Sequence, residues 1–361
     1  MGSDRRSVVR WWVILVLALV SAVTATVPAS AGVDRGPRPL RVMTQNLYLG
    51  ASLTPALQAT TTSEFLAAVA GIYRSSRGND FSVRAAALAE EIATHQPDLI
   101  GLQEVSRWEP SGPASVAPRE DYLRILLRAL AARGLDYEVA AVSVNAVIGP
   151  VPLVTPCGSN APGACSITFT DRDVILVNRD SRGLRWWNPE NGNFAAQAVF
   201  TPPVPGAEPV SFNRGWASID GRYRGERFHF VTTHLEVAGF AAVQQAQARE
   251  LLSGPAFAPG ADLVVGDMNS AADGSTTPTY ALLRERFQDA WSVRRDGPGY
   301  TCCQAPTLDN LTSQLDERID VILTRGARSV SAELVGDAPI QPDRPRWLSD
   351  HAGVVAALRL R

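Results

Sequence analysis

Polar side chains stand at the ends of apolar, strand-like runs throughout this sequence. A buried strand that stops on a carboxylate, an amide or an imidazole places that group at the edge of its sheet. Five or six such endings can converge on one metal ion and one phosphate group, so the pattern constrains how the strands are arranged. In chain order, these side chains are Asn46, Glu104, His234, Asp267, Asn269, Asp320, Asp350 and His351.

The chain is long enough to bury a sizeable core. It has 361 residues, of which 45% are hydrophobic and 19% are charged, within the range of one large domain or two small ones. No shift in composition and no long linker divides its middle, and the polar set extends from residue 46 to residue 351. We therefore predict a single domain over residues 32–361.

Residues 1–31 have the pattern of a secretory signal peptide. Arg5-Arg6 precedes an apolar run over residues 11–23, and small residues lead to a cleavage site after Ala31. The run is short for a membrane span, which disfavours an uncleaved anchor. The paired arginines also permit a twin-arginine (Tat) route, but the residues after them fit that pattern poorly, so the general secretory (Sec) route is preferred. We expect a secreted, extracellular protein.

The charge balance argues against tight, non-specific binding of nucleic acid. Removal of residues 1–31 would take away three Arg and one Asp and change the net charge from −2 to −4. All 34 basic residues are Arg, and no basic stretch marks a nucleic-acid footprint. A nuclease is not excluded, because a bound metal ion supplies local positive charge. The Arg, Ala and Gly content indicates a GC-rich, bacterial genome.

Four cysteines follow the predicted signal, and in an exported protein they favour disulfides over a zinc site. Their spacing also lacks the paired C-x-x-C of a zinc site. Of the three ways to pair them, the simplest joins Cys157 to Cys165 and closes a loop rich in Pro and Gly. Cys302 and Cys303 would then form an adjacent bridge or remain two free thiols, and both possibilities stay open.

Strands and helices interleave along the chain, and several neighbouring strands have the spacing of hairpins. Strands are predicted over residues 40–44, 99–103, 137–144, 174–178, 227–233, 263–266, 319–323 and 354–360. Helices are predicted over residues 65–73, 84–95, 120–133 and 241–252, and residues 180–209 form either an irregular excursion or edge hairpins. This order favours an α/β fold with two mixed sheets packed face to face and helices outside. A doubly wound parallel sheet would need more helices and a Gly-rich phosphate loop after its first strand, which Asn46–Gly50 does not provide.

Hydrolysis of a phosphate ester requires positive charge at the phosphoryl oxygens, an oriented water and a stabilised leaving oxygen. A hard divalent cation supplies part of this, and it prefers carboxylate and amide oxygens. Glu104 directly follows an apolar strand and is the natural metal ligand. A Glu after a strand is commonly a solvated turn residue, but the rest of the polar set favours the metal role here.

The sharpest local motif is Gly266-Asp267-Met268-Asn269. Gly266 lets the backbone turn tightly as the strand ends. Asp267 and Asn269 can then face the same side, one to align or deprotonate a water and the other to donate to a phosphate oxygen. A structural Asx turn would have the same local sequence, so the motif gains weight only from the other strand ends.

Two histidines belong to the polar set. His351, in Ser349-Asp350-His351, precedes the last apolar run, and Asp320 is the best candidate to hydrogen-bond its imidazole and favour the charged form. A cationic His351 would stabilise the pentavalent transition state or the leaving group. His234 ends another strand. Either histidine could instead be a core residue bonded to a backbone group.

Together, the motifs Gln-Asn-Leu, Gln-Glu-Val, Thr-His-Leu, Gly-Asp-Met-Asn and Ser-Asp-His resemble those of the endonuclease/exonuclease/phosphatase superfamily. The resemblance covers about residues 40–360 and keeps the order of the motifs. It implies a four-layer α/β sandwich that hydrolyses phosphoester bonds without a covalent intermediate. The implied cofactor is Mg²⁺, with Mn²⁺ as an alternative.

By motif position, the resemblance also implies a role for each residue. The metal ligands would be Glu104, Asn46 and Asp350; the catalytic residues would be Asp267, His351, His234, Asn269 and Asp320; and the substrate-binding residues would be Asn46, Asn269 and Arg172.

The sequence departs from the family pattern in one strand. Where members often have Gly-Val or Gly-Ala, this chain has Asp171-Arg172-Asp173-Val174. Arg172 could reach the phosphate, whereas Asp173 stands where the family has Gly. The segment Tyr300–Gln304 precedes Asp320, is expected to frame the site, and matches no well-studied branch of the family.

We predict a secreted, metal-dependent hydrolase of phosphoester bonds that acts as a monomer without a protein partner. A lipid or small phosphoester is the favoured substrate, because the mature chain is acidic and has no Arg-rich stretch. Trp186-Trp187 could touch a lipid surface or simply pack. A secreted DNA or RNA endonuclease is the first alternative. A catalytically inactive binding module of the same fold is the second, although Glu104, Asp267 and His351 are all present.

Overall fold

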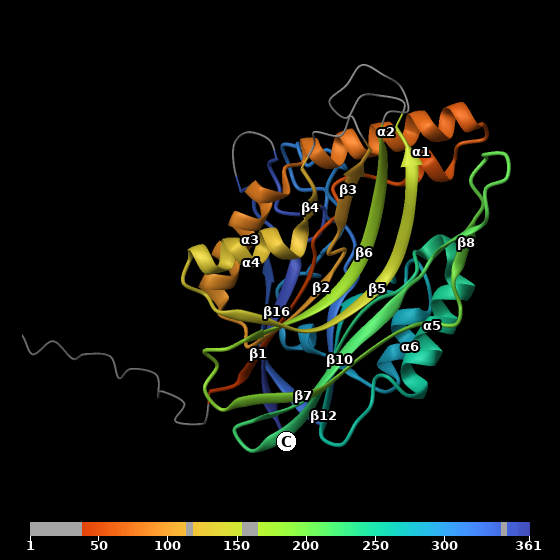
Figure 1. Cartoon of the computed structure of the whole chain (residues 1–361). Coiled ribbons are helices and arrows are strands. Elements are labelled where there is room, and N and C mark those ends of the chain that lie inside the picture. The colour runs from red at the N-terminus through yellow and green to blue at the C-terminus, as the bar shows by residue number, and fades with distance from the viewer. Residues whose placement is uncertain (1–37, 113–117, 154–164, 341–344) are drawn as a thin grey trace, which may run out of the picture. The chain divides into compact units, whose positions relative to one another are not determined.

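Two β-sheets pack face to face, and helices cover their outer faces (Figure 1). The computed structural model describes residues 38–112, 118–153, 165–340 and 345–361, and residues Pro39–Arg361 form one compact unit. The predicted signal peptide and Cys157 lie outside the described residues. Among the described residues, no helix is long and apolar enough to cross a membrane.

The first sheet has the strand order β15-β16-β1-β2-β6-β3-β4, and β5 pairs with β6. Its strands are β1 (Leu40–Asn46), β2 (Leu99–Gln103), β3 (Arg107–Ser111), β4 (Glu120–Asp121), β5 (Tyr137–Pro152), β6 (Ser166–Asn178), β15 (Ala327–Val335) and β16 (Gly353–Leu360). The sheet is mixed, because β1 and β2 are parallel whereas β1 and β16 are antiparallel.

The second sheet has the strand order β13-β14-β12-β11-β10-β7. Its strands are β7 (Leu184–Asn193), β10 (Gly215–Tyr223), β11 (Glu226–His234), β12 (Ala261–Asp267), β13 (Gln288–Asp289) and β14 (Asp320–Arg325). It is also mixed, since β11 and β12 are parallel whereas β12 and β14 are antiparallel. A separate two-stranded hairpin consists of β8 (Ala198–Phe200) and β9 (Val210–Phe212).

Helices complete the outer layers. They are α1 (Thr54–Leu57), α2 (Thr62–Gly78), α3 (Phe81–His95), α4 (Tyr122–Ala132), α5 (Ala241–Ser253) and α6 (Thr279–Arg284). Helices α3 and α4 lie over the first sheet, and α5 and α6 lie over the second (Figure 1). Helix α2 begins with a capping box, in which Thr61 and Glu64 satisfy each other's backbone N–H groups.

Three apolar layers separate the four structural layers. The alternation of side chains along a strand creates them, because successive residues face opposite sides of a sheet. On β12, Leu263 and Val265 face the core between the sheets, whereas Val264 packs under α5 and α6. The sheets approach closely at Gly101, where a Cβ would lie 2.4 Å from a Val265 methyl group. The predicted sandwich of two mixed sheets flanked by helices is confirmed.

The predicted strands are all present, and most are longer than expected. Strand β1 continues two residues further, to Asn46, and β5 and β6 form a long hairpin that extends beyond both predicted ranges. The edge-hairpin interpretation of residues 180–209 is correct, because β7 lies at the edge of the second sheet. Strands β3, β10, β13 and β15 were not predicted, and the helix expected from residue 120 begins at Tyr122, after the short strand β4.

Candidate active site

Strand register places three predicted site residues side by side in the second sheet. His234, at the end of β11, pairs with Asp267 at the end of the parallel strand β12. Asp267 in turn pairs with Asp320, the first residue of the antiparallel strand β14. The apolar stretches that form these strands therefore deliver an imidazole and two carboxylates to one edge of the sheet.

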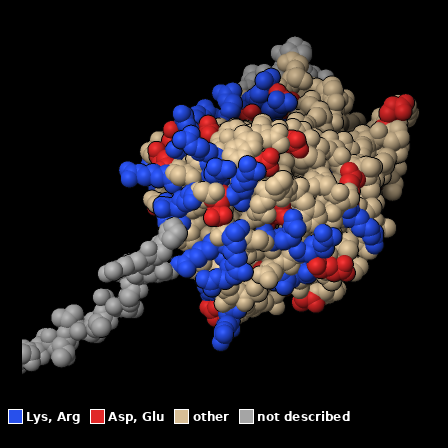
Figure 2. Space-filling model, turned by 90° about the horizontal axis from the view of Figure 1, so that it is seen from below, with Lys and Arg blue, Asp and Glu red and all other residues tan. Residues whose placement is uncertain are grey.

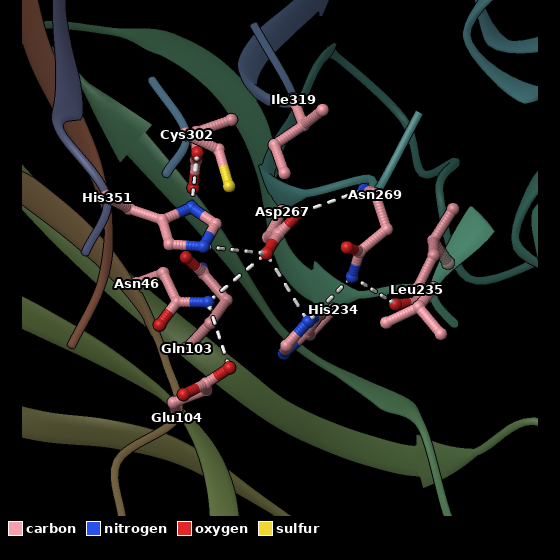
Figure 3. Close-up of polar contacts among 12 residues, drawn as sticks. Asn46, Gln103, Glu104, His234, Leu235, Asp267, Asn269, Cys302, Ile319 and His351 are labelled. Atoms are coloured by element: carbon pink, nitrogen blue, oxygen red, sulfur yellow. Dashed lines mark hydrogen bonds and ion pairs between the residues drawn. The ribbon is translucent and has the colours of Figure 1, made fainter. Parts of the chain in front are cut away.

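The first sheet contributes Asn46 and Glu104 from the same end. Asn46 is the last residue of β1 and pairs with Gln103, the last residue of β2. Glu104 follows with a φ of 52°, a left-handed conformation that is uncommon for a residue with a side chain. The Asn46 amide donates to Glu104 Oε1 at 3.2 Å and to Asp267 Oδ2 at 3.1 Å. Asn46 thus joins the two sheets at the centre of the site (Figure 3).

Asp267 is oriented by the turn that follows β12. Gly266 has a φ of 145°, and a Cβ there would lie 1.9 Å from the Thr233 carbonyl oxygen, so only glycine fits. The Asn269 backbone N–H donates to Asp267 Oδ1 at 2.8 Å, which closes an Asx turn. Burial, followed by the nearby Asp320 carboxylate, raises the pKa of Asp267 to about 6. Asp267 can therefore exchange a proton near neutral pH.

His351 and Asp320 form the predicted pair. The distance from His351 Nδ1 to Asp320 Oδ2 is 2.8 Å, and both side chains are buried. Burial alone would lower the pKa of His351, but Asp320 and Asp350 raise it well above the usual 6.5. The other ring nitrogen, Nε2, lies 3.9 Å from Asp267 Oδ2. A cationic imidazole therefore faces the carboxylate of Asp267 (Figure 3).

His234 has the opposite electrostatic character. Burial, and then the positive charges of Arg214 and His351, lower its pKa well below 6.5, so the imidazole is neutral. Its Nε2 lies 3.0 Å from the Asn269 amide nitrogen, which also donates to the Leu235 carbonyl at 3.0 Å. The two histidines of the site thus supply one neutral and one charged ring.

Asp350 lies next to this cluster. Its Oδ1 is 3.9 Å from His351 Nε2. Burial raises its pKa to about 7, although the charge on His351 opposes the rise. The neighbouring Ser349 hydroxyl donates to the Asn46 carbonyl oxygen at 2.8 Å, which ties the Ser-Asp-His segment to the end of β1.

The Tyr300–Gln304 segment lies against His351. The backbone of Cys302 forms a bridge with His351, and Cys303 Sγ lies 4.0 Å from His351 Nε2. Cys302 and Cys303 are joined to each other by a disulfide, which is the adjacent bridge that the sequence left open. Cys165 is also disulfide-bonded. Its predicted partner, Cys157, lies outside the described residues.

Arg172 is not brought into this cluster. Its guanidinium donates to Asp121 at 2.6 Å and to the Val105 carbonyl at 2.9 Å. These contacts hold the loop after Glu104 against the start of α4. A phosphate contact by Arg172 stays a prediction that no distance in the structure supports.

Arg214, rather than Arg172, is the arginine that lies beside the catalytic cluster. One guanidinium nitrogen lies 3.0 Å from His234 Nδ1, and another lies 3.5 Å from Glu236 Oε1. Arg214 also acts electrostatically on Glu104 and Asp267. Arg214 gave no sequence signal, because it follows a Pro-rich stretch and precedes a strand that was not predicted. Glu236, which contacts Arg214, had only a weak sequence signal: it lies two residues after His234.

The donor set suits a hard divalent cation. The Asn46 amide links the carboxylates of Glu104 and Asp267, so two buried carboxylates lie close together beside it. Burial, followed by the charge of Asp171, also raises the pKa of Glu104. Crowded, buried carboxylates of this kind are stabilised by a cation that binds oxygen ligands.

The chain belongs to the endonuclease/exonuclease/phosphatase family, whose model matches residues 43–351. This family includes phosphatases, nucleases and phosphodiesterases, and its members are generally hydrolases of phosphoester bonds. No curated protein matches this chain in sequence.

Several solved structures have the same fold. An endonuclease/exonuclease/phosphatase from Bacteroides vulgatus is 16% identical, with a TM-score of 0.53 over 90% of this chain and 100% of that chain. A mannosyl-6-phosphatase from Bacteroides thetaiotaomicron is 17% identical, with a TM-score of 0.53 over 89% and 100%. A family member from Beutenbergia cavernae is 21% identical, with a TM-score of 0.51 over 90% and 72%. At these identities, the likeness shows the fold alone.

Proposed function

We propose that this protein is a divalent-metal-dependent phosphoester hydrolase that uses an activated water. The observation that carries the proposal is the arrangement of Asp320, His351 and Asp267. A buried Asp–His pair at 2.8 Å holds a charged imidazole 3.9 Å from a carboxylate whose pKa is about 6. One group can take a proton from water while the other stabilises negative charge, which is what phosphoester hydrolysis requires.

Each residue at the centre would then have one task. Asp267 orients and deprotonates the attacking water, and the Asn269 amide contacts a phosphoryl oxygen. His351 stabilises the charge that develops on phosphorus or on the leaving group. His234, being neutral, contributes a hydrogen bond, and Arg214 supplies fixed positive charge beside it. Since none of these residues is lost, an inactive binding module is the least supported alternative.

Glu104 and Asp350 would hold the metal ion, Mg²⁺ or Mn²⁺; the side-chain oxygen of Asn46, the third predicted ligand, accepts the Tyr48 N–H at 2.9 Å in this structure. When bound, the ion neutralises charge on the phosphoryl group. The raised pKa values of Glu104 and Asp350 indicate carboxylates that the protein alone does not neutralise. These side chains fit the group in type and charge.

The substrate, we propose, is a lipid or small phosphoester that carries an apolar group. A cavity of about 70 Å³ is lined only by apolar side chains, among them Leu53, Phe65, Trp108 and Phe169. It lies close to the metal side of the site: Trp108 donates to the Leu49 carbonyl, and the Leu49 N–H donates to Glu104 Oε2. Its size admits a short alkyl segment, since it is about half that of an apolar cavity of roughly 150 Å³ that holds benzene.

Surface charge supports this substrate over nucleic acid. Arginines gather on the face seen from below (Figure 2). This end carries the turn from β10 to β11 and the C-terminal end of β16, whereas the catalytic residues lie at the other end of these strands. A nucleic-acid strand held by this basic face would lie away from Asp267. A secreted DNA or RNA endonuclease remains the alternative function.

A substrate panel tests the proposal. Purified protein with Mg²⁺ is assayed against plasmid DNA, RNA, sphingomyelin, phosphatidylinositol phosphates and bis-p-nitrophenyl phosphate. We expect turnover of a lipid or small ester with the DNA left intact. Plasmid nicking that disappears in the His351→Ala variant would instead establish the nuclease. No turnover of any substrate would oppose the hydrolase.

The cavity has its own test. Leu57 lines the cavity and is 42% exposed, so Leu57→Asp should fold. We expect it to lower kcat/KM for an ester with an alkyl chain and to leave bis-p-nitrophenyl phosphate unaffected. Val330→Asp is the matched control, because Val330 is also 42% exposed but does not line the cavity. Equal losses on both substrates would contradict the assignment.

We also propose that the protein is exported as a monomer after cleavage behind Ala31. The apolar run over residues 11–23 and the small residues before Gly32 support this. N-terminal sequencing of secreted material should begin near Gly32, and light scattering should give the mass of one chain. An intact Met1 in secreted protein would contradict cleavage.

A further inference from the structure

Strands β5 and β6 carry a second group of buried polar residues next to the active site. On β6, Asp171 and Asp173 point to the same face, because they are two residues apart. Ser143 of β5 pairs with Asp173, and a bulge between Val144 and Ala146 inserts Asn145 opposite this stretch. The face is turned towards the second sheet: a Cβ at Gly215 of β10 would lie 2.8 Å from Ser143 Oγ.

The carboxylates of this group lack partners. Asp173 is fully buried, and among the described residues neither of its side-chain oxygens has a partner at hydrogen-bond distance. Asp171 is 7% exposed, and its Oδ1 also lacks a partner. The Asn145 amide donates to Asp171 Oδ2 at 3.4 Å and also favours the charged form of Asp173, while its own oxygen accepts from the Ser143 hydroxyl. Buried carboxylate oxygens without partners are unfavourable, and they are normally paired or bound to a metal ion.

The group adjoins Glu104. Asp171 is the charge with the largest effect on Glu104, and Glu104 and Asp171 both act on Asp173. Arg214 and Arg172 are the nearby cations, but Arg214 contacts Glu236 and His234 and Arg172 contacts Asp121. Among the described residues, neither arginine therefore forms a direct ion pair with Asp171 or Asp173.

The wider site has a large excess of acidic groups. Four cationic groups, Arg84, Arg172, Arg214 and His351, act on seven carboxyl groups in this part of the described structure: Glu104, Asp171, Asp173, Glu236, Asp267, Asp320 and Asp350. A single divalent cation at Glu104 would still leave negative charge in excess.

We propose that Asp171 and Asp173 hold a second divalent cation, beside the one expected at Glu104. Oxygen-only ligands of this kind select a hard ion such as Mg²⁺, Mn²⁺ or Ca²⁺. Asn145 acts as a positioning residue, because its amide orients the Asp171 carboxylate. Asp173, which stands where other family members often have glycine, thereby gains a function specific to this chain. This proposal goes beyond the hydrolase function and does not depend on the identity of the substrate.

Counting bound Mn²⁺ tests the proposal. Equilibrium dialysis of the purified protein against Mn²⁺ should give two ions per chain. Asp173→Asn and Asp171→Asn should each give one ion, Glu104→Gln should also give one, and the double variant Asp173→Asn with Glu104→Gln should give none. Near-ultraviolet circular dichroism checks that each variant keeps its tertiary packing, and the two aspartate variants serve as independent tests should one of them fail to fold.

Asp220→Asn is the matched control. Asp220 is an aspartate of the second sheet whose oxygens are already bonded, to His229 at 2.8 Å and to Asn188 at 3.1 Å. It should leave two ions bound. One ion in the wild-type protein, or two ions retained by either folded aspartate variant, would overturn the second site. Loss of activity without loss of an ion would bear on the hydrolase function instead, so the two failures are distinguishable.

Discussion

The catalytic cluster and the Asp171–Asp173 pair differ in how their buried charges are compensated. Asp267 accepts hydrogen bonds from the Asn46 amide and from the Asn269 backbone, and His351 is bonded to Asp320. In contrast, both oxygens of Asp173 and one oxygen of Asp171 have no hydrogen-bond partner within the part of the chain that the structure describes. The carboxylates of the first region are thus compensated by hydrogen bonds of the protein, whereas we propose that a cation compensates those of the second.

The position of each region along its strands explains the difference. Asp267 is the last residue of β12, so the turn that follows can direct a free backbone N–H at its carboxylate. Asp171 and Asp173 lie within β6, where the backbone groups are used in pairing with β5. The polar groups that act on Asp171 there are the Asn145 amide and the backbone of Arg172. The turn after a strand can thus orient a carboxylate directly, whereas the proposed cation would compensate the carboxylates in the middle of β6.

Chelation should have the largest effect, because it acts on both regions at once. We expect EDTA to abolish activity and Mg²⁺ or Mn²⁺ to restore it, since the pKa of Glu104 stays raised despite the charges of His351 and Arg214 and a bound cation would add the missing positive charge. The measurement is turnover before chelation, after it, and after metal is added back. Full activity in chelator would sink the metal requirement.

Loss of a catalytic side chain should come next. His351→Ala and Asp267→Ala should each lower kcat by about 10²–10⁴-fold, which is the usual contribution of general acid–base groups, without unfolding the protein. His229→Ala is the control, because His229 is also buried and bonded to an aspartate but lies outside the cluster. Near-wild-type turnover in either catalytic variant would remove that residue from the mechanism.

A smaller effect is expected in the pH profile of Asp320→Asn. In the wild type, Asp267 with a pKa of about 6 sets the acid limb, and His351, with a raised pKa, sets the alkaline limb. An amide at position 320 removes the charge that keeps His351 protonated, so the alkaline limb of kcat should move to lower pH. Activity should then fall more at pH 8 than at pH 6.

Asp220→Asn is the matched control for this profile. The Asp220–His229 pair has the same 2.8 Å separation as the Asp320–His351 pair, but it makes no contact with the catalytic residues described here. Its loss should leave both limbs in place. A shift of the same size in both variants would show that the profile reports general stability rather than His351.

The smallest expected effect is on the free energy of unfolding, which can be compared between a variant of each region. In EDTA, Asp173→Asn should raise the free energy of unfolding by about 1–3 kcal/mol, because it removes the negative charge that burial disfavours. Asp267→Asn should give a smaller gain or a loss, because its carboxylate already accepts two hydrogen bonds. Urea denaturation of both variants measures the difference. Equal changes would mean that the two regions are compensated alike.

Local sequence patterns predicted the strand ends well. Apolar stretches followed by a polar residue identified the ends of β1, β2, β11 and β12, because a strand buried on both faces is apolar almost throughout. Gly266 marked the turn that orients Asp267. The pairing of His351 with Asp320 followed from the chemistry of the two groups. The structure bears out this contact at 2.8 Å.

Sequence patterns failed where a strand is mixed in character. Strand β10 contains Gly, Ser, Asp and Arg among its apolar residues, so neither the strand nor the adjacent Arg214 was recognised. Arg172 was assigned to the phosphate because it lies beside the family motif. Its side chain instead faces Asp121, a residue 51 positions earlier, and local sequence carries no information about that partner.

The sequence by itself determined which groups stand at the strand ends, because the period of apolar residues and the turn glycine are local properties. Only the tertiary structure decided which of those groups meet. Register across β11, β12 and β14 brings His234, Asp267 and Asp320 level, and the packing of two sheets adds Asn46 and Glu104 from the other side. Whether Asp173 has a hydrogen-bond partner likewise depends on which side chains of distant segments lie near it. Local sequence patterns do not contain this information.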